Sequence, residues 1–108
     1  MYEQRKQRFA GLDWWQPFTQ GQMNDAGYGL LENKKFDDAI AAFRMNADRF
    51  PQSWEVWDSL GEGLMGAGRL PEAIGAYEKA LQVEPTNWNA GAERKAIEGM
   101  RASLTPKK

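Results

Sequence analysis

Two carboxylic acids, Asp58 and Glu62, lie four residues apart, the spacing that puts two side chains on one face of a helix. Such a pair could serve as general acid and general base. That chemistry also needs a substrate pocket and burial that shifts the pKa of one partner. The surrounding sequence predicts neither, so we interpret both residues as surface charges and predict that the chain is not an enzyme.

The residue types that are missing exclude most other catalytic sites. The 108 residues include no His and no Cys. Without imidazole or thiolate, the chain cannot build a Ser-His or Cys-His nucleophile, a Cys-based zinc site or a disulfide. We therefore expect no metal, no cofactor and no small-molecule substrate.

Charge and glycine content argue against nucleotides, nucleic acids and membranes as partners. Lys and Arg number 14 against 15 Asp and Glu, a formal net charge of -1. The basic stretch Arg5, Lys6 and Arg8 is too small for a nucleic-acid footprint. The glycines between residues 61 and 68 follow no strand and precede no Lys-Ser or Lys-Thr, unlike a phosphate loop. The absence of a secretory signal or apolar span favours a cytoplasmic location.

An internal repeat organises the chain. A shift of 34 residues aligns residues 20–53 with residues 54–87. The identical pairs are small, apolar or helix-ending residues: Gly27/Gly61, Gly29/Gly63, Leu30/Leu64, Ala39/Ala73, Ile40/Ile74, Ala42/Ala76 and Pro51/Pro85. Apolar residues at helical spacing predict amphipathic helices over 20–33, 36–49, 54–67 and 70–83. Small residues within each pair let the helices approach, and Phe43 or Tyr77 fills the gap.

The signals for helix ends agree with this scheme. Thr19 and Gln22 have the spacing of a capping box, and Phe18 with Met23 that of a hydrophobic staple. The later signals are Ser53 and Asn87 as N-caps, Pro71 in a first turn, and Pro51 and Pro85 as terminators. No segment shows strand alternation, so we predict an all-α fold, a short right-handed α-solenoid of two helix pairs.

The flanks must complete this solenoid, because two helix pairs alone bury little surface. Residues 88–105 predict a capping helix and residues 106–108 a frayed tail. The apolar stripe expected to pack on the preceding unit is Ala90, Ile97, Met100 and Leu104. The residues expected to face water are Glu93, Arg94, Lys95, Glu98 and Arg101.

Residues 1–18 form a flanking segment that is predicted to be partly helical. It carries Trp14, Trp15 and Phe18, which are costly to expose. These aromatics either cover the open edge of the first unit or form an interface with another domain or a second copy of the chain. The sequence leaves both alternatives open.

The second unit reads Trp57-x-x-Leu60-Gly61-x-x-Leu64, then Ala73-x-x-x-Tyr77-x-x-Ala80, then Pro85. This pattern resembles the tetratricopeptide repeat. The first unit is similar, with Asn46 in place of a small alanine. The resemblance implies one repeat over 19–53, a second over 54–87, and a role in protein-protein interaction.

A narrower resemblance rests on the runs Met23 to Leu31, Phe43 to Pro51 and Trp57 to Glu62. They are similar to the tetratricopeptide tail that follows the catalytic domain of some bacterial β-lactamase-like serine hydrolases. The chain has no Ser-x-x-Lys or Gly-x-Ser-x-Gly motif, so the resemblance brings no catalytic residue. It implies an alternative function as a self-associating or domain-supporting module, including a homodimer.

In this repeat family the first helix of each unit lines a concave groove. The resemblance therefore assigns peptide binding to the residues Asn24, Tyr28, Leu31, Glu55, Asp58, Glu62 and Met65. The repeat register places Asn24 beside Asp58 and then Ala92, and Tyr28 beside Glu62 and then Ala96. Such an acidic groove suits a cationic peptide or protein. The alternative is that its carboxylates are only a solvated helix face.

Overall fold

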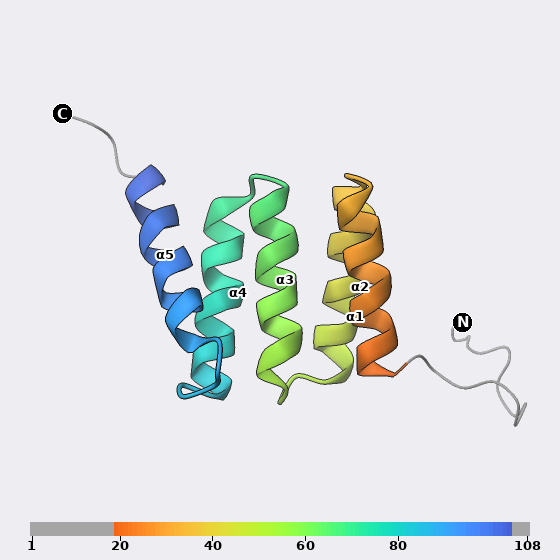
Figure 1. The fold of residues 1–108 in the computed structure, drawn as a ribbon, viewed down its shortest axis with the longest axis horizontal. Helices are drawn as coiled ribbons and strands as arrows, with labels where there is room; N and C mark the ends of the chain where they lie inside the picture. The colour runs from red at the N-terminus through yellow and green to blue at the C-terminus, as the bar shows by residue number, and fades with distance from the viewer. Residues whose placement is uncertain (1–18, 105–108) are drawn as a thin grey trace, which may run out of the picture.

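The computed structural model describes residues 19–104, which form five α-helices. The helices are α1 (Gln20–Glu32), α2 (Phe36–Arg49), α3 (Trp54–Gly66), α4 (Leu70–Val83) and α5 (Ala90–Leu104). They alternate in direction and stand side by side in a short solenoid (Figure 1). No strand occurs between residues 19 and 104, so the all-α prediction is confirmed. None of these helices is long and apolar enough to cross a membrane.

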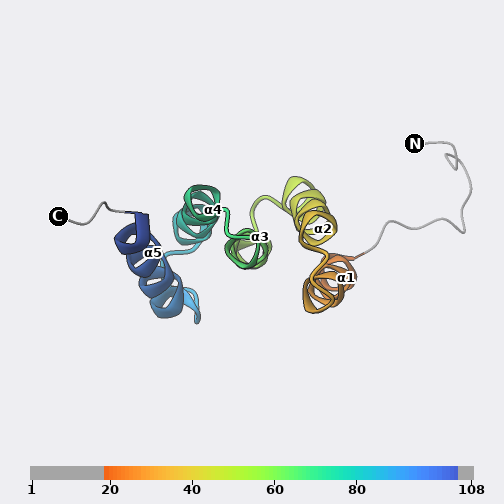
Figure 2. The ribbon, with the colours of Figure 1, turned by 90° about the horizontal axis from the view of Figure 1, so that it is seen from above.

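The helices form two layers. Figure 2 shows α1, α3 and α5 in one row and α2 and α4 in the other, with α3 set back between α1 and α5. The apolar core lies between the layers and is formed by residues such as Ile40, Phe43, Leu60 and Leu64. The row of α1, α3 and α5 therefore presents a face with a recessed middle, and we call it the concave face.

Glycine lets the two helices of each repeat approach closely. A Cβ built on Gly27 of α1 would lie 2.3 Å from Cε1 of Phe43 in α2. One built on Gly61 of α3 would lie 3.0 Å from the Tyr77 ring in α4. Both rings are buried, so each aromatic occupies the space that a glycine leaves open. The predicted pairing of small and aromatic residues is confirmed.

The turns between paired helices use the same left-handed residue. Lys34 has φ 61° between α1 and α2, and Gly68 has φ 79° at the equivalent point between α3 and α4. In the first turn the backbone N–H of Lys35 donates to the carbonyl of Leu30 at 2.9 Å. Glycine adopts this conformation readily and lysine does so at a cost, so the first turn is strained.

The capping box at the start of α1 is confirmed. The N–H of Gln22 donates to Thr19 Oγ1 at 3.1 Å, and the N–H of Thr19 donates to Gln22 Oε1 at 2.9 Å. Ser53 is the N-cap of α3, but its side chain makes no capping bond there; its Oγ accepts from Gln20 Nε2 at 2.9 Å. Phe18, the predicted staple partner, lies outside the described residues.

The last helix differs from the prediction in its start and in its buried face. The side chain of Asn87 accepts from the N–H of Asn89 at 2.7 Å, and this turn delays α5 to Ala90. Ala90, Ile97 and Met100 are buried as expected, but Leu104 is 47% exposed at the end of the helix.

Glu93 was expected to face water, and this prediction is wrong, because only 1% of the residue is exposed. It lies four residues before Ile97 and seven before Met100, so it shares their buried stripe.

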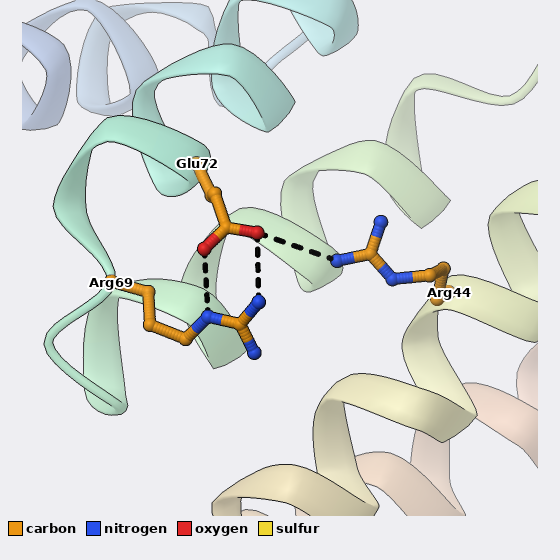
Figure 3. Close-up of polar contacts among 3 residues, drawn as sticks. All are labelled: Arg44, Arg69 and Glu72. Atoms are coloured by element: carbon orange, nitrogen blue, oxygen red, sulfur yellow. Dashed lines mark hydrogen bonds and ion pairs between the residues drawn. The ribbon is translucent and has the colours of Figure 1, made fainter.

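On the face opposite the concave face, an ion-pair cluster joins α2 to the start of α4 (Figure 3). The guanidinium of Arg69 donates to both oxygens of Glu72, at 2.7 and 2.8 Å, and Arg44 of α2 lies 4.0 Å from the same carboxylate. The hydrogen bond from Arg69 lowers the pKa of Glu72. All three side chains are about half exposed, so solvent screens the cluster and its contribution to stability is small.

Candidate functional site

The concave face contains a hollow of about 340 Å³ between α1, α3 and the start of α5. It is lined by Gln20, Gly21, Asn24, Tyr28, Trp54, Glu55, Asp58, Ser59 and Trp88. Gln20, Trp54 and Trp88 are spaced 34 residues apart and so occupy the same position in successive units. We call this hollow the concave pocket.

Tyr28 stands on one wall of the concave pocket. Its ring meets the edge of buried Phe43, with centroids 5.0 Å apart. Its hydroxyl donates to the carboxylate of Glu62 and lies 3.3 Å from Ser59 Oγ. Burial, followed by the hydrogen bond to Glu62, raises the pKa of Tyr28, so this hydroxyl stays protonated as a donor. The predicted register of Tyr28 beside Glu62 is confirmed.

Further hydrogen bonds hold α1 against α3. Ser59 donates to Oδ1 of Asn24, and Gln20 Nε2 donates to Oε1 of Glu55 at 3.1 Å. Asn46, the departure from the repeat pattern, is buried in α2 and donates to the carbonyl of Gln20 at 3.0 Å. Its amide therefore links the C-terminal part of α2 to the start of α1.

Asp58 lies at the centre of a polar network between α3 and α5. The amide of Asn89 donates to both of its oxygens, at 3.2 and 3.3 Å. Buried Glu93 accepts from Asn87 Nδ2 at 3.0 Å through one oxygen, while its other oxygen has no amide or hydroxyl partner in the part of the chain that the structure describes. Burial, a hydrogen bond with Glu93 and the charge of Glu93 raise the pKa of Asp58 to about 7.

This network corrects two expectations. Asp58 was interpreted as an ordinary surface charge, but it is half-buried and holds a proton far more tightly than a solvated carboxylate. Ala92 was expected to continue the row of Asn24 and Asp58, and it lies instead in a different hollow, between α4 and α5. Glu93 rather than Ala92 lies beside Asp58, at the same spacing of 35 residues that separates Ser59 from Asn24.

Four of the predicted binding residues meet in the concave pocket: Asn24, Tyr28, Glu55 and Asp58. Glu62 adjoins it through its contact with Tyr28. Leu31 and Met65 lie outside it, and Leu31 packs toward the end of α3, 3.3 Å from where a Cβ on Gly66 would be. The predicted interface residues Trp14, Trp15 and Phe18 lie outside the described residues.

Sequence reasoning missed Trp54, Ser59, Trp88, Asn89 and Glu93 as members of this region. The repeat register carried a signal for the tryptophans, because 54 and 88 are one period apart and follow Gln20. It carried a weaker one for Glu93, which is the equivalent of Ser59. Asn89 is the equivalent of Glu55, but the sequence analysis did not predict its contact with Asp58.

The arrangement offers hydrogen-bond acceptors and aromatic surface. Asp58 and Glu62 have different partners, Glu93 and Tyr28. Within residues 19–104, no group of three or more acidic side chains could hold a metal ion. The chemistry most available here is recognition of a donor-rich or cationic group.

The helix pair α3 and α4, with its glycine facing an aromatic ring, agrees with a known family. The tetratricopeptide repeat profile matches residues 54–87. The chain contains a tetratricopeptide repeat. In the described structure the same packing recurs in α1 and α2, where Gly27 and Phe43 replace Gly61 and Tyr77.

Several curated tetratricopeptide-repeat and receptor proteins are similar to this chain. A peroxisomal targeting signal receptor from Eremothecium gossypii is 33% identical over 92 residues, covering 73% of this chain and 16% of the receptor. Tetratricopeptide repeat protein 33 from Mus musculus is 36% identical over 58 residues, covering 54% of this chain and 22% of that protein. The chain therefore spans a small part of the length of these relatives.

A chloroplast relative shows the same relationship. The tetratricopeptide repeat domain-containing protein PYG7 from Arabidopsis thaliana is 31% identical over 74 residues, covering 68% of this chain and 25% of that protein. These relatives support an interaction module of tetratricopeptide type.

Proposed function

We propose that this chain is a noncatalytic protein-interaction module that binds a cationic peptide segment of another protein along the concave face. The main observation that supports this proposal is the concave pocket, whose lining includes Asn24, Tyr28, Glu55 and Asp58 from α1 and α3. One similar protein is named as a receptor for a targeting signal, which supports recognition of a peptide by this type of scaffold.

The charge of this face supports a cationic ligand. Glu55, Asp58 and Glu62 project from successive turns of α3, and no Lys or Arg of residues 19–104 lines the pocket. A negative patch attracts positively charged segments and accelerates their encounter. We assign Leu31 and Met65 to apolar contacts farther along the same face, because both lie near the C-terminal ends of their helices.

A selection from a random peptide library tests this function. Peptides enriched on the wild-type chain are expected to carry Lys or Arg, and the double variant Asp58→Lys, Glu62→Lys should weaken their binding about tenfold or more in calorimetry. The matched control is Asp48→Lys, because Asp48 is an exposed acidic residue on α2, in the row of helices away from the concave face. The proposal would be contradicted if the enriched peptides lacked basic residues, or if they bound the double variant as tightly as the Asp48→Lys control.

A second candidate is a self-associating or domain-supporting module, such as the tail of a serine hydrolase. The observation that favours it is a hollow of about 990 Å³ at the end of the solenoid, between α4 and α5. Leu81 and Ile97 line it together with acidic and basic side chains. A solenoid packs its next helix against such an end. Measurement of the solution mass separates the candidates, since this one predicts a dimer or a complex with the supported domain.

A further inference from the structure

We propose that the concave pocket is an anchor for one side chain, and that Trp54 and Trp88 with Glu55 and Asp58 bind the cationic end of a Lys or Arg from the partner peptide. This inference rests on the proposed function and identifies the ligand group that the concave face recognises.

The two tryptophans form the aromatic part of this anchor. The rings of Trp54 on α3 and Trp88 before α5 meet edge to face, with centroids 5.5 Å apart and planes at 85°. Trp88 is 82% exposed, although a tryptophan gains its stabilisation from buried area. A large aromatic side chain left this open next to a hollow is better suited to contact with a ligand than to packing of the core.

The carboxylates supply the charge. Glu55 is contacted by the neutral amide of Gln20 and Asp58 by the neutral amide of Asn89, so neither charge is compensated by these contacts. Behind Asp58 stands Glu93, 1% exposed, and one of its oxygens meets no amide or hydroxyl donor among residues 19–104. A buried acceptor without a donor is unfavourable, and a cation near Asp58 would lower this cost through its field.

The combination selects a particular class of ligand. Anions are repelled by Glu55 and Asp58, and a purely apolar group would leave these carboxylates desolvated without compensation. An ammonium or guanidinium group gains from both the carboxylates and the faces of indole rings. A Lys or Arg side chain also carries an apolar stem that can cover the ring of Trp88.

Nuclear magnetic resonance can test the anchor with small probes at pH 8, where Asp58 is ionised. The indole N–H signals of Trp54 and Trp88 are followed during titration with n-butylammonium chloride. We expect saturable shifts of both signals, with no equivalent effect from n-butanol or from sodium chloride at the same ionic strength. Equal shifts with n-butanol, or no saturation, would overturn the inference.

Variants then assign the contributions. Trp88→Leu, at a side chain that is 82% exposed, should leave the fold intact and weaken n-butylammonium binding about fivefold or more. Asp58→Asn should have a similar effect, whereas the control Asp48→Asn on α2 should have none. Unchanged binding in Trp88→Leu and Asp58→Asn would overturn the anchor.

The anchor and the proposed peptide recognition can fail independently of each other. If library peptides bind the concave face but tolerate norleucine at every Lys and citrulline at every Arg, the anchor is wrong and the interaction module stands. If n-butylammonium binds as expected but no peptide is selected, the anchor stands and peptide recognition is wrong.

Discussion

A contact with the carboxyl group of Glu93 in α5 adds to burial in raising the pKa of Asp58 in α3 to about 7. It joins the edge of the concave pocket to the interior of the last helix, where Glu93 is buried. The concave face and the attachment of α5 therefore share one titratable contact.

This contact predicts a pH dependence of stability. Asp58 has its ordinary pKa of 3.8 in the unfolded chain and a pKa of about 7 in the folded one, where Glu93, Glu55 and the amide of Asn89 surround it. Because the folded chain binds the proton more tightly, this contribution is full below pH 3.8, falls as the pH rises to about 7, and is constant above.

The measurement is urea unfolding of wild type and Asp58→Asn between pH 4 and pH 9. We expect the difference in the free energy of unfolding to change in favour of the variant as the pH rises, since Asn needs no proton. Asp48→Asn, on the surface of α2, serves as the control. A difference that is independent of pH would contradict the raised pKa of Asp58.

A neutral residue at position 93 should stabilise the chain above pH 7. In Glu93→Gln the side-chain oxygen can still accept from Asn87, and its amide can donate to ionised Asp58. We expect a gain of about 1 kcal/mol at pH 8, measured by urea unfolding. Glu98→Gln, at an exposed position on the same helix, should change stability little; an equal gain there would argue against a specific contact.

The glycines of α1 should respond to alanine in opposite directions. Gly27→Ala places a methyl group against the Phe43 ring and should cost about 1–3 kcal/mol. Gly29→Ala meets nothing within 4 Å and should gain about 0.5–1 kcal/mol, because alanine favours the helix. Thermal and urea unfolding measure both, and changes of the same sign would show that the close approach of α1 and α2 is wrong.

The strained turn between α1 and α2 offers a stabilising substitution. Lys34→Gly removes the side chain from a residue with φ 61° and copies Gly68 of the second unit. We expect a gain of about 0.5–1 kcal/mol, the left-handed penalty less the greater freedom of glycine in the unfolded chain. Lys34→Ala retains the Cβ and should give no gain. If alanine stabilises as much as glycine, the backbone conformation is not the cause.

The sequence by itself determined the repeat and its packing. A period of 34 residues, glycines facing aromatic residues and the Thr19 capping box fixed the first four helices, because these signals are local or recur in register. The register also placed Tyr28 beside Glu62, since equivalent positions in stacked helices are neighbours.

The tertiary structure alone decided the surroundings of Asp58. Glu93 of α5 lies inward beside Asp58 of α3, one repeat on from the contact of Ser59 with Asn24. The repeat register makes Glu93 the equivalent of Ser59, but only the tertiary structure shows that its carboxyl group is buried there. Burial and the approach of two carboxyl groups set the pKa of Asp58, and these depend on how separate helices meet in space.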